Sequence, residues 1–269
     1  MPTKIYKVDA FTSTPYSGNP AAICVLEKPA EEQWMQVVAS EMNLAETAYL
    51  SKEGDSYRLR WFTPTVEMDI CGHATLASAH ILWEQGYVPE GNAINFKTLS
   101  GDLTVTQSDN ENEIVMDFPA DPESMVPLTE DLIVILRESL GATPIYVGKS
   151  QRDFLVEVES AEILRTMSPN MSILAEVPMR GYIVTAKSDI PEYDFISRCF
   201  FPAVGIPEDQ VTGSAHCCLA LYWGGKLGKS EMLGFQASMR GGKVRVKIVG
   251  DRVKLIGSCV TVLIGELLS

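Results

Sequence analysis

Hydrophobic and polar positions along this chain predict short strands with a few helices between them. From Ala30 to Met42 the apolar side chains recur three or four positions apart, which is the spacing of a helix with one buried face. Between Tyr57 and Trp61 every second side chain is an arginine, which is the period of a half-buried strand. The other predicted strands are Lys4 to Phe11 and Ala21 to Leu26, followed by strands around Gly101 over Phe96 to Val105 and then Ile114 to Phe118.

Prolines interrupt this pattern near the middle of the chain. Pro119, Pro122 and Pro127 follow closely on one another, and proline ends both helices and strands. We therefore predict a domain boundary there, with an N-terminal domain over residues 1–120 and a C-terminal domain over residues 121–269. The last strand is a candidate to pack back on the N-terminal domain.

The second half of the chain repeats the order of elements of the first half. The segment FTPTVEMDICGHATLASAHILW begins at Phe62, and FFPAVGIPEDQVTGSAHCCLALYW begins at Phe200. When Gly72 is aligned with Gly213, both segments show a strand, a loop, a glycine and an apolar helix in the same order. This shared order predicts two related domains.

The two helices of the repeat run from Gly72 to Glu84 and from Gly213 to Lys226. Both are apolar nearly all round, so we expect each to be buried inside the strands of its own domain. Each begins at a glycine after a polar loop. Its first backbone N–H groups and the positive end of its dipole therefore favour an anion at the helix start.

Composition and charge limit the classes of function. The chain has 269 residues, 46% of them hydrophobic, and a formal net charge of -13. This composition excludes a disordered chain, and the acidity argues against binding to nucleic acid or to an anionic membrane surface. We expect no signal peptide and no membrane span. The six cysteines form no C-x-x-C pair and the three histidines form no zinc-binding spacing, so we predict reduced thiols, a cytoplasmic protein and no metal site.

Glu46 and His73 are the first candidates for proton transfer. Glu46 falls in a predicted loop beside apolar neighbours, where a partly shielded carboxyl group suits general acid–base work. An ordinary solvated glutamate is the alternative. His73 at a helix start is suited to moving protons near neutral pH, and a histidine that only caps the helix is its alternative. His80 and His216 fall within apolar helices, and we interpret them as core residues.

Cys71 immediately precedes the first apolar helix. A cysteine at a helix N-terminus has a lowered pKa and can abstract a proton, whereas a small buried core residue is the alternative interpretation. The aligned position in the repeat is Thr212, so a mechanism with two opposed thiols lacks its second thiol.

A polar cluster precedes the second apolar helix. Asp209, Thr212 and Ser214 are residue types preferred as helix N-caps, and capping alone could explain them. The functional interpretation adds that Gly213 lets the backbone approach a ligand closely. Asn19, in the sequence Gly18-Asn19-Pro20, is a turn residue by default and a candidate substrate ligand otherwise. Gln236, Ser238 and the segment Arg240-Gly241-Gly242 are candidates to bind a carboxylate, but a hairpin turn is the simpler interpretation.

Together these motifs resemble the PhzF-like family, named for the phenazine-biosynthesis isomerase. The segments that carry the resemblance are VDAFTSTPYSGNPAA, EMNLAETAYL, LRWFTPTVEMDICGHATLASAH and GIPEDQVTGSAHCCLALYW, followed by SMRGG. The resemblance implies an α+β fold similar to diaminopimelate epimerase. That fold has two pseudo-symmetric domains, each a mixed, barrel-like sheet wrapped around a central apolar helix, with the active site between them.

The resemblance also implies roles for individual residues. The family's acid–base glutamate matches Glu46, with Ala45 where serine is usual. The family's active-site histidine and aspartate match His73 and Asp209. Its serine matches Ser214, and the backbone N–H groups of Gly72 and Gly213 would bind substrate; Gln210 stands where proline is usual.

The expected function is therefore a cofactor-independent isomerase of a small carboxylic acid, with Glu46 moving the proton. No metal, nucleotide or flavin is required by this scheme. Because family members are commonly homodimers, we expect a homodimer. Two alternatives remain: a racemase or epimerase that depends on Cys71, and a non-catalytic interaction protein with the same fold.

Overall fold

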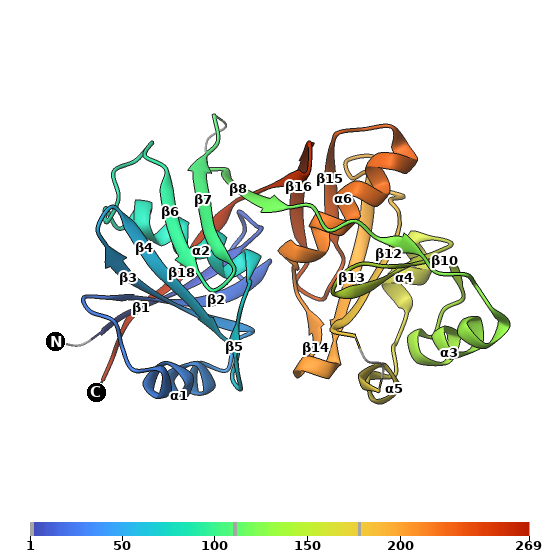
Figure 1. Ribbon diagram of the computed structural model, residues 1–269, viewed down its shortest axis with the longest axis horizontal. Coiled ribbons are helices and arrows are strands. Elements are labelled where there is room, and N and C mark those ends of the chain that lie inside the picture. Colours follow the sequence, from blue (N-terminus) through green and yellow to red (C-terminus); the bar gives the residue numbers. More distant parts are fainter. Residues whose placement is uncertain (1–2, 110–111, 177–178, 269) are drawn as a thin grey trace. The chain divides into compact units, whose positions relative to one another are not determined.

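The computed structural model describes residues 3–109, 112–176 and 179–268 (Figure 1). Two compact units are found: the first comprises Met1–Phe118 and Lys254–Ser269, and the second comprises Pro119–Val253. Strand β17, Arg252–Gly257, leads from the second unit back into the first.

The first unit is a curved mixed sheet around one helix. Its other strands are β1 (Thr3–Ala10), β2 (Asn19–Leu26), β3 (Glu46–Glu53), β4 (Ser56–Phe62), β5 (Glu67–Met68), β6 (Ile94–Thr98), β7 (Gly101–Gln107), β8 (Ile114–Pro119) and β18 (Cys259–Leu267). Strand β1 pairs antiparallel with both β18 and β2. From β2 the pairing continues parallel to β3, antiparallel to β4, parallel to β6 and antiparallel to β7.

Helix α2, Gly72–Glu84, is the centre of this unit. It contacts β1, β2, β3 and β18, and its side chains are buried almost throughout. An apolar helix without a polar face has no side to present to water, so the strands surround it. Helix α1, Glu32–Met42, lies outside the sheet and packs Met35 and Ala39 against Tyr49 and Phe62.

The second unit has the same pairing pattern. Its strands are β9 (Ser124–Met125), β10 (Pro144–Lys149), β11 (Asp153–Val158), β12 (Gly181–Lys187), β13 (Phe195–Phe201), β14 (Ile206–Asp209), β15 (Glu231–Gln236) and β16 (Gly242–Val249). From β10 to β16 the pairing is antiparallel, parallel, antiparallel, parallel and antiparallel. This is the sequence of pairings found from β1 to β7, so the predicted pseudo-symmetric α+β fold is confirmed.

Helices cover both faces of the second sheet. The central helix α6, Gly213–Leu227, contacts β15 and β16, and its Trp223 side chain donates a hydrogen bond to Thr185 on β12. The shorter helices pack against side chains of the opposite face, such as Tyr182 and Val184. They are α3 (Glu130–Leu140), α4 (Ala161–Thr166) and α5 (Met171–Ala175); a single 3-10 turn spans Pro202–Val204. No helix among the described residues is long and apolar enough to cross a membrane.

Two local predictions are corrected by the structure. Glu46 does not lie in a loop but is the first residue of β3, and Asn19 is not a turn residue but the first residue of β2. Contacts between strands explain both differences. Strands β2 and β3 pair in parallel, with Ala21 opposite Glu46, and this pairing extends both strands beyond their apolar runs.

Candidate active site

The first unit brings four of the candidate side chains together at one edge of its sheet. Strands β2 and β3 begin side by side, so Asn19 and Glu46 start at the same edge. Cys71 and His73 lie at the start of α2, which packs against both strands. All four residues are buried: Asn19 is 0% exposed, His73 3%, Cys71 5% and Glu46 7%.

His73 is the centre of this cluster. Its Nε2 atom lies 3.1 Å from Oε2 of Glu46, and its Nδ1 atom lies 3.1 Å from Nδ2 of Asn19. The Sγ atom of Cys71 lies 3.6 Å from the same Nδ1. His73 and Glu46 are close enough for an ion pair, but the two groups are not aligned as a hydrogen bond. Neither Nε2 nor Oε2 has a hydrogen-bond partner among the described residues. Each of these two buried atoms retains the capacity to bond a ligand.

The negative charge of the cluster sets the protonation of His73. Burial by itself lowers the pKa of His73, but Cys71 and Glu46 oppose this effect, and the pKa lies well above 6.5. Burial, followed by the charge of Glu46, raises the pKa of the Cys71 thiol to about 11. Cys71 is therefore a neutral thiol near pH 7, and the carboxyl group of Glu46 lies beside the other ring nitrogen of His73.

The expectation of a lowered pKa for Cys71 is thus wrong. It assumed that a helix N-terminus would stabilise the thiolate. Burial and the nearby carboxyl group of Glu46 both disfavour a negative charge on Cys71, and together they outweigh the helix dipole. The other interpretation of Cys71, as a small buried residue, agrees with the structure.

Asn19 reaches His73 because Gly18 makes a tight bend before it. Gly18 has a φ of +65°, and a Cβ atom there would lie 2.2 Å from the carbonyl oxygen of Ala10. Only glycine fits this position. The amide of Asn19 then faces His73 and orients its ring, a role that the sequence did not suggest.

The same cluster also has the composition of a small metal site. Ligand atoms of Glu46, Cys71 and His73 lie within 4.8 Å of one another. A metal would require a thiolate and a neutral imidazole. The raised pKa values of Cys71 and His73 favour the opposite protonation states. A metal bound by these three residues would therefore displace protons from Cys71 and His73, and its affinity would rise with pH.

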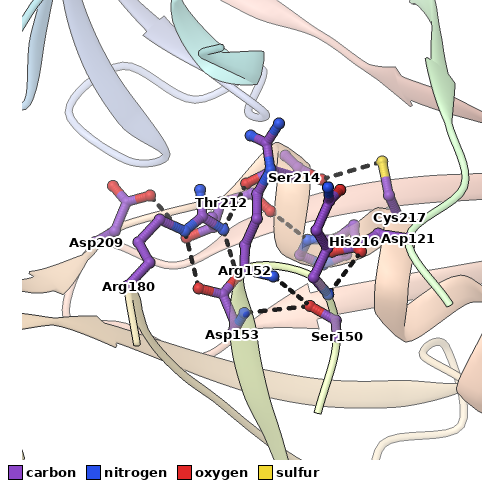
Figure 2. A network of polar contacts seen from close by, with 12 residues as sticks. Asp121, Ser150, Arg152, Asp153, Arg180, Asp209, Thr212, Ser214, His216 and Cys217 are labelled. Carbon is purple, nitrogen blue, oxygen red and sulfur yellow. Dashed lines mark hydrogen bonds and ion pairs between the residues drawn. The ribbon is translucent and has the colours of Figure 1, made fainter. Parts of the chain in front are cut away.

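In the second unit, Asp209 and Thr212 form a closed hydrogen-bond network before α6 (Figure 2). The hydroxyl of Thr212 donates to Oδ2 of Asp209 over 2.7 Å. Gln236 accepts a bond of 2.8 Å from the N–H of Thr212 and donates one of 2.7 Å to the carbonyl of Asp209. Thr212 is the N-cap residue, but its side chain makes no capping bond to the helix. Capping therefore does not explain this polar cluster.

Ser214 contacts an arginine that no sequence motif indicated. Nη2 of Arg180 lies 3.2 Å from Oγ of Ser214. The same guanidinium forms two parallel hydrogen bonds with the carboxylate of Asp153, which is 0% exposed (Figure 2). Arg180 lies in a segment without a recognisable pattern, and it reaches Ser214 only through the pairing of β12 with β11 and β13.

The two remaining histidines have structural surroundings. His216 is 0% exposed and its Nδ1 donates to the carbonyl of Thr212 over 2.8 Å, as expected of a core residue. Burial lowers the pKa of His216 to about 4. His80 is only partly buried, in contact with Glu84 and Thr261, so the expectation of a core residue is only partly met there.

Comparison with known proteins gives the family. The family model for phenazine biosynthesis-like proteins matches residues 8–265. A curated relative from Halalkalibacterium halodurans, named an uncharacterized isomerase, is 53% identical over 269 residues, which cover 100% of this chain and 99% of the relative. The chain belongs to the phenazine biosynthesis-like family. A solved PhzF-family structure from Enterococcus faecalis superposes on this phenazine biosynthesis-like protein with a TM-score of 0.93, at 38% identity and 100% coverage of both chains.

A more distant similarity concerns the fold alone. A hydroxyproline epimerase from Agrobacterium vitis is 9% identical, with a TM-score of 0.63, and the alignment covers 98% of this chain and 92% of the epimerase. Together with the relatives named isomerases, the family membership makes this phenazine biosynthesis-like protein an isomerase.

Proposed function

We propose that the protein isomerises a small carboxylic acid by moving a proton between two of its carbon atoms, with Glu46 as the group that carries the proton. The observation that supports this most is the pair of buried atoms, Oε2 of Glu46 and Nε2 of His73. They lie 3.1 Å apart, and their hydrogen-bonding capacity is unfilled. Buried polar groups are normally bonded, so such exceptions indicate a place for a ligand.

The proposed reaction needs only groups of the chain itself. The Glu46 carboxylate takes a proton from a carbon of the substrate, and the electron pair of the broken C–H bond enters the conjugated acid as an enolate-like anion. Glu46 then delivers this proton, or one that its carboxyl group has exchanged with solvent, to a different carbon, where a new C–H bond forms and the double bond has shifted. Atoms and electrons balance without an oxidant, a reductant or a cofactor.

The other candidate residues receive supporting roles in this proposal. Protonated His73 stabilises the developing negative charge beside Glu46, and Asn19 holds the His73 ring. Backbone N–H groups at Gly72, where no side chain caps α2, bind the anion. In the second unit, we propose that Asp209 assists proton movement and that Gly213 and Ser214 bind the substrate. A homodimer also remains a proposal, to be measured by light scattering.

The test is deuterium incorporation from D₂O, followed by NMR. The probes are cyclic dihydro-hydroxy acids, including dihydro-hydroxyanthranilate, and amino acids. We expect deuterium to enter one probe with the wild type and not with Glu46→Gln. Glu53→Gln, at the other end of β3, is the matched control and should leave exchange unchanged.

Two variants separate the alternatives. We expect Cys71→Ser to retain exchange, because a thiol with a pKa of about 11 is a poor base near pH 7. If Cys71→Ser abolished exchange while Glu46→Gln had little effect, the protein would be a cysteine-dependent racemase or epimerase instead.

Exchange lost on treatment with a chelator and restored by added metal would assign Glu46, Cys71 and His73 to a metal site. If no probe exchanged, and a protein partner bound equally to wild type and Glu46→Gln, an interaction protein would be the better interpretation.

A further inference from the structure

Two hydroxyl groups lie at the start of α6, and their hydrogen bonds differ. The Thr212 hydroxyl donates to Asp209 and accepts from Nε2 of Gln236 over 3.2 Å, so its proton is used inside the protein. The Ser214 hydroxyl accepts from Arg180 and donates to no described residue. A serine hydroxyl has one proton to donate, and at Ser214 that proton is left for a ligand.

Arg180 is held firmly enough by its neighbours to keep donating its hydrogen bond to the Ser214 hydroxyl. Its Nε atom donates to Oδ1 of Asp153 over 2.8 Å, and Nη2 donates to Oδ2. The guanidinium also lies over the ring of Phe201, at 4.9 Å from the ring centroid. Paired and stacked on fixed groups, the guanidinium cannot turn away from Ser214 without breaking a bidentate ion pair.

We propose that Arg180, held by Asp153, is a positioning residue that makes the Ser214 hydroxyl a hydrogen-bond donor for an anionic group of the ligand. Arg180 occupies an acceptor site of Ser214 with a positively charged donor, so the Ser214 proton points elsewhere. This inference rests on the proposed function, in which Ser214 binds the substrate, and it names the part of the substrate concerned: its carboxylate.

The arrangement predicts a preference for a carboxylate over the corresponding amide. A hydroxyl whose proton is left for the ligand bonds a carboxylate strongly, since a hydrogen bond to a charged group exceeds one to a neutral group. The positive charge of Arg180, 3.2 Å from the Ser214 oxygen, adds to the preference for an anion. A neutral amide is not attracted by the charge of Arg180, and its hydrogen bond with Ser214 is weaker.

The experiment measures binding of benzoate and benzamide by calorimetry, since these probes differ in charge and have similar shape. The variants are Arg180→Lys, Ser214→Ala and the double variant. Lysine keeps the charge but cannot bond Asp153 twice and reach Ser214 as well. Arg198→Lys is the matched control: Arg198 also forms a bidentate pair, with Glu208, and lies 5.0 Å from the centroid of the Phe200 ring. No bond joins Arg198 to Ser214 in the described residues.

We expect wild type to bind benzoate about tenfold more tightly than benzamide, the ratio that one charged hydrogen bond supports. Arg180→Lys and Ser214→Ala should each weaken benzoate binding by about this factor and leave benzamide binding unchanged. The double variant should bind benzoate no more weakly than Ser214→Ala, because Arg180 acts through Ser214. Arg198→Lys should change neither affinity, although it should lower thermal stability as much as Arg180→Lys does.

Three results would overturn the inference: no benzoate preference in wild type, losses that add in the double variant, or a loss of the same size with Arg198→Lys. Deuterium exchange with Glu46→Gln keeps the two proposals distinguishable. Retained exchange in Glu46→Gln would refute the role of Glu46, whereas the pattern of benzoate binding tests Arg180 and Ser214 alone.

Discussion

Replacing Glu46 by glutamine removes the negative charge next to His73 and keeps the shape of the side chain. In the wild type, two opposing effects act on the imidazole: burial favours the neutral ring, and the negative charge beside it favours the protonated ring. We predict that Glu46→Gln reverses the balance and moves the pKa of His73 from well above 6.5 to below it.

The size of the charge effect follows from the geometry. Two unit charges 3.1 Å apart attract by about 5 kcal/mol at an effective dielectric constant of about 20. That attraction disappears in Glu46→Gln, while burial remains. Cys71 cannot replace the lost charge, because its thiol, with a pKa of about 11, is neutral near pH 7.

The sign of the pH dependence is fixed by the raised pKa of His73. A histidine whose pKa is higher in the folded state than the ordinary 6.5 stabilises the folded state fully below 6.5. This stabilisation is lost as the pH rises through the raised value. Glu46→Gln should therefore lower the free energy of unfolding more at about pH 6 than at about pH 9.

The assay is an NMR titration of the histidine ring carbons. Only three histidines are present in the sequence, and the structure separates them. Burial lowers the pKa of His80 below 6.5 and that of His216 to about 4, so both serve as internal controls that Glu46→Gln leaves unchanged. Urea unfolding at the two pH values supplies the stability measurement.

Either of two results would refute the reasoning. If His73 of the wild type titrated at or below 6.5, the charge of Glu46 would not dominate over burial. If Glu46→Gln left the pKa of His73 unchanged, another group would supply the charge.

Two further predictions concern the framework that positions this cluster. Gly18→Ala should cost well over about 1 kcal/mol in urea unfolding, because the new Cβ atom meets the Ala10 carbonyl at 2.2 Å. Gly54→Ala has a similar positive φ with open space around it and should cost about 1 kcal/mol or less; an equal cost for both would contradict the close-contact argument. Leu76→Ala in α2, at a fully buried site, should lower stability by about 2–5 kcal/mol, whereas Val37→Ala, at a site 61% exposed, should change it by no more than about 0.5 kcal/mol. A small loss for Leu76→Ala would mean that α2 is not the packed centre of its unit.

The structure confirms the sequence predictions that depend on spacing along the chain. The predicted helix from Gly72 to Glu84 is observed with those bounds, and the one predicted from Gly213 to Lys226 ends one residue later, at Leu227. A run of apolar side chains on every face of a helix requires burial wherever the helix lies. The repeated order of elements predicted two related domains, and the structure shows the same order of strand pairings in both units.

Charge states and hydrogen-bond partners were decided by the tertiary structure. Asn19 and His73 are 54 positions apart, and Arg180 and Ser214 are 34 apart, so no local pattern records these contacts. The pKa of Cys71 depends on burial against Glu46, which the parallel pairing of β2 and β3 brings to the start of α2. The sequence by itself determined the two buried helices, the repeat and the family motifs, because these are properties of neighbouring residues. Which groups are protonated, and toward what they point, was determined only by folding, because those properties depend on distant residues brought into contact.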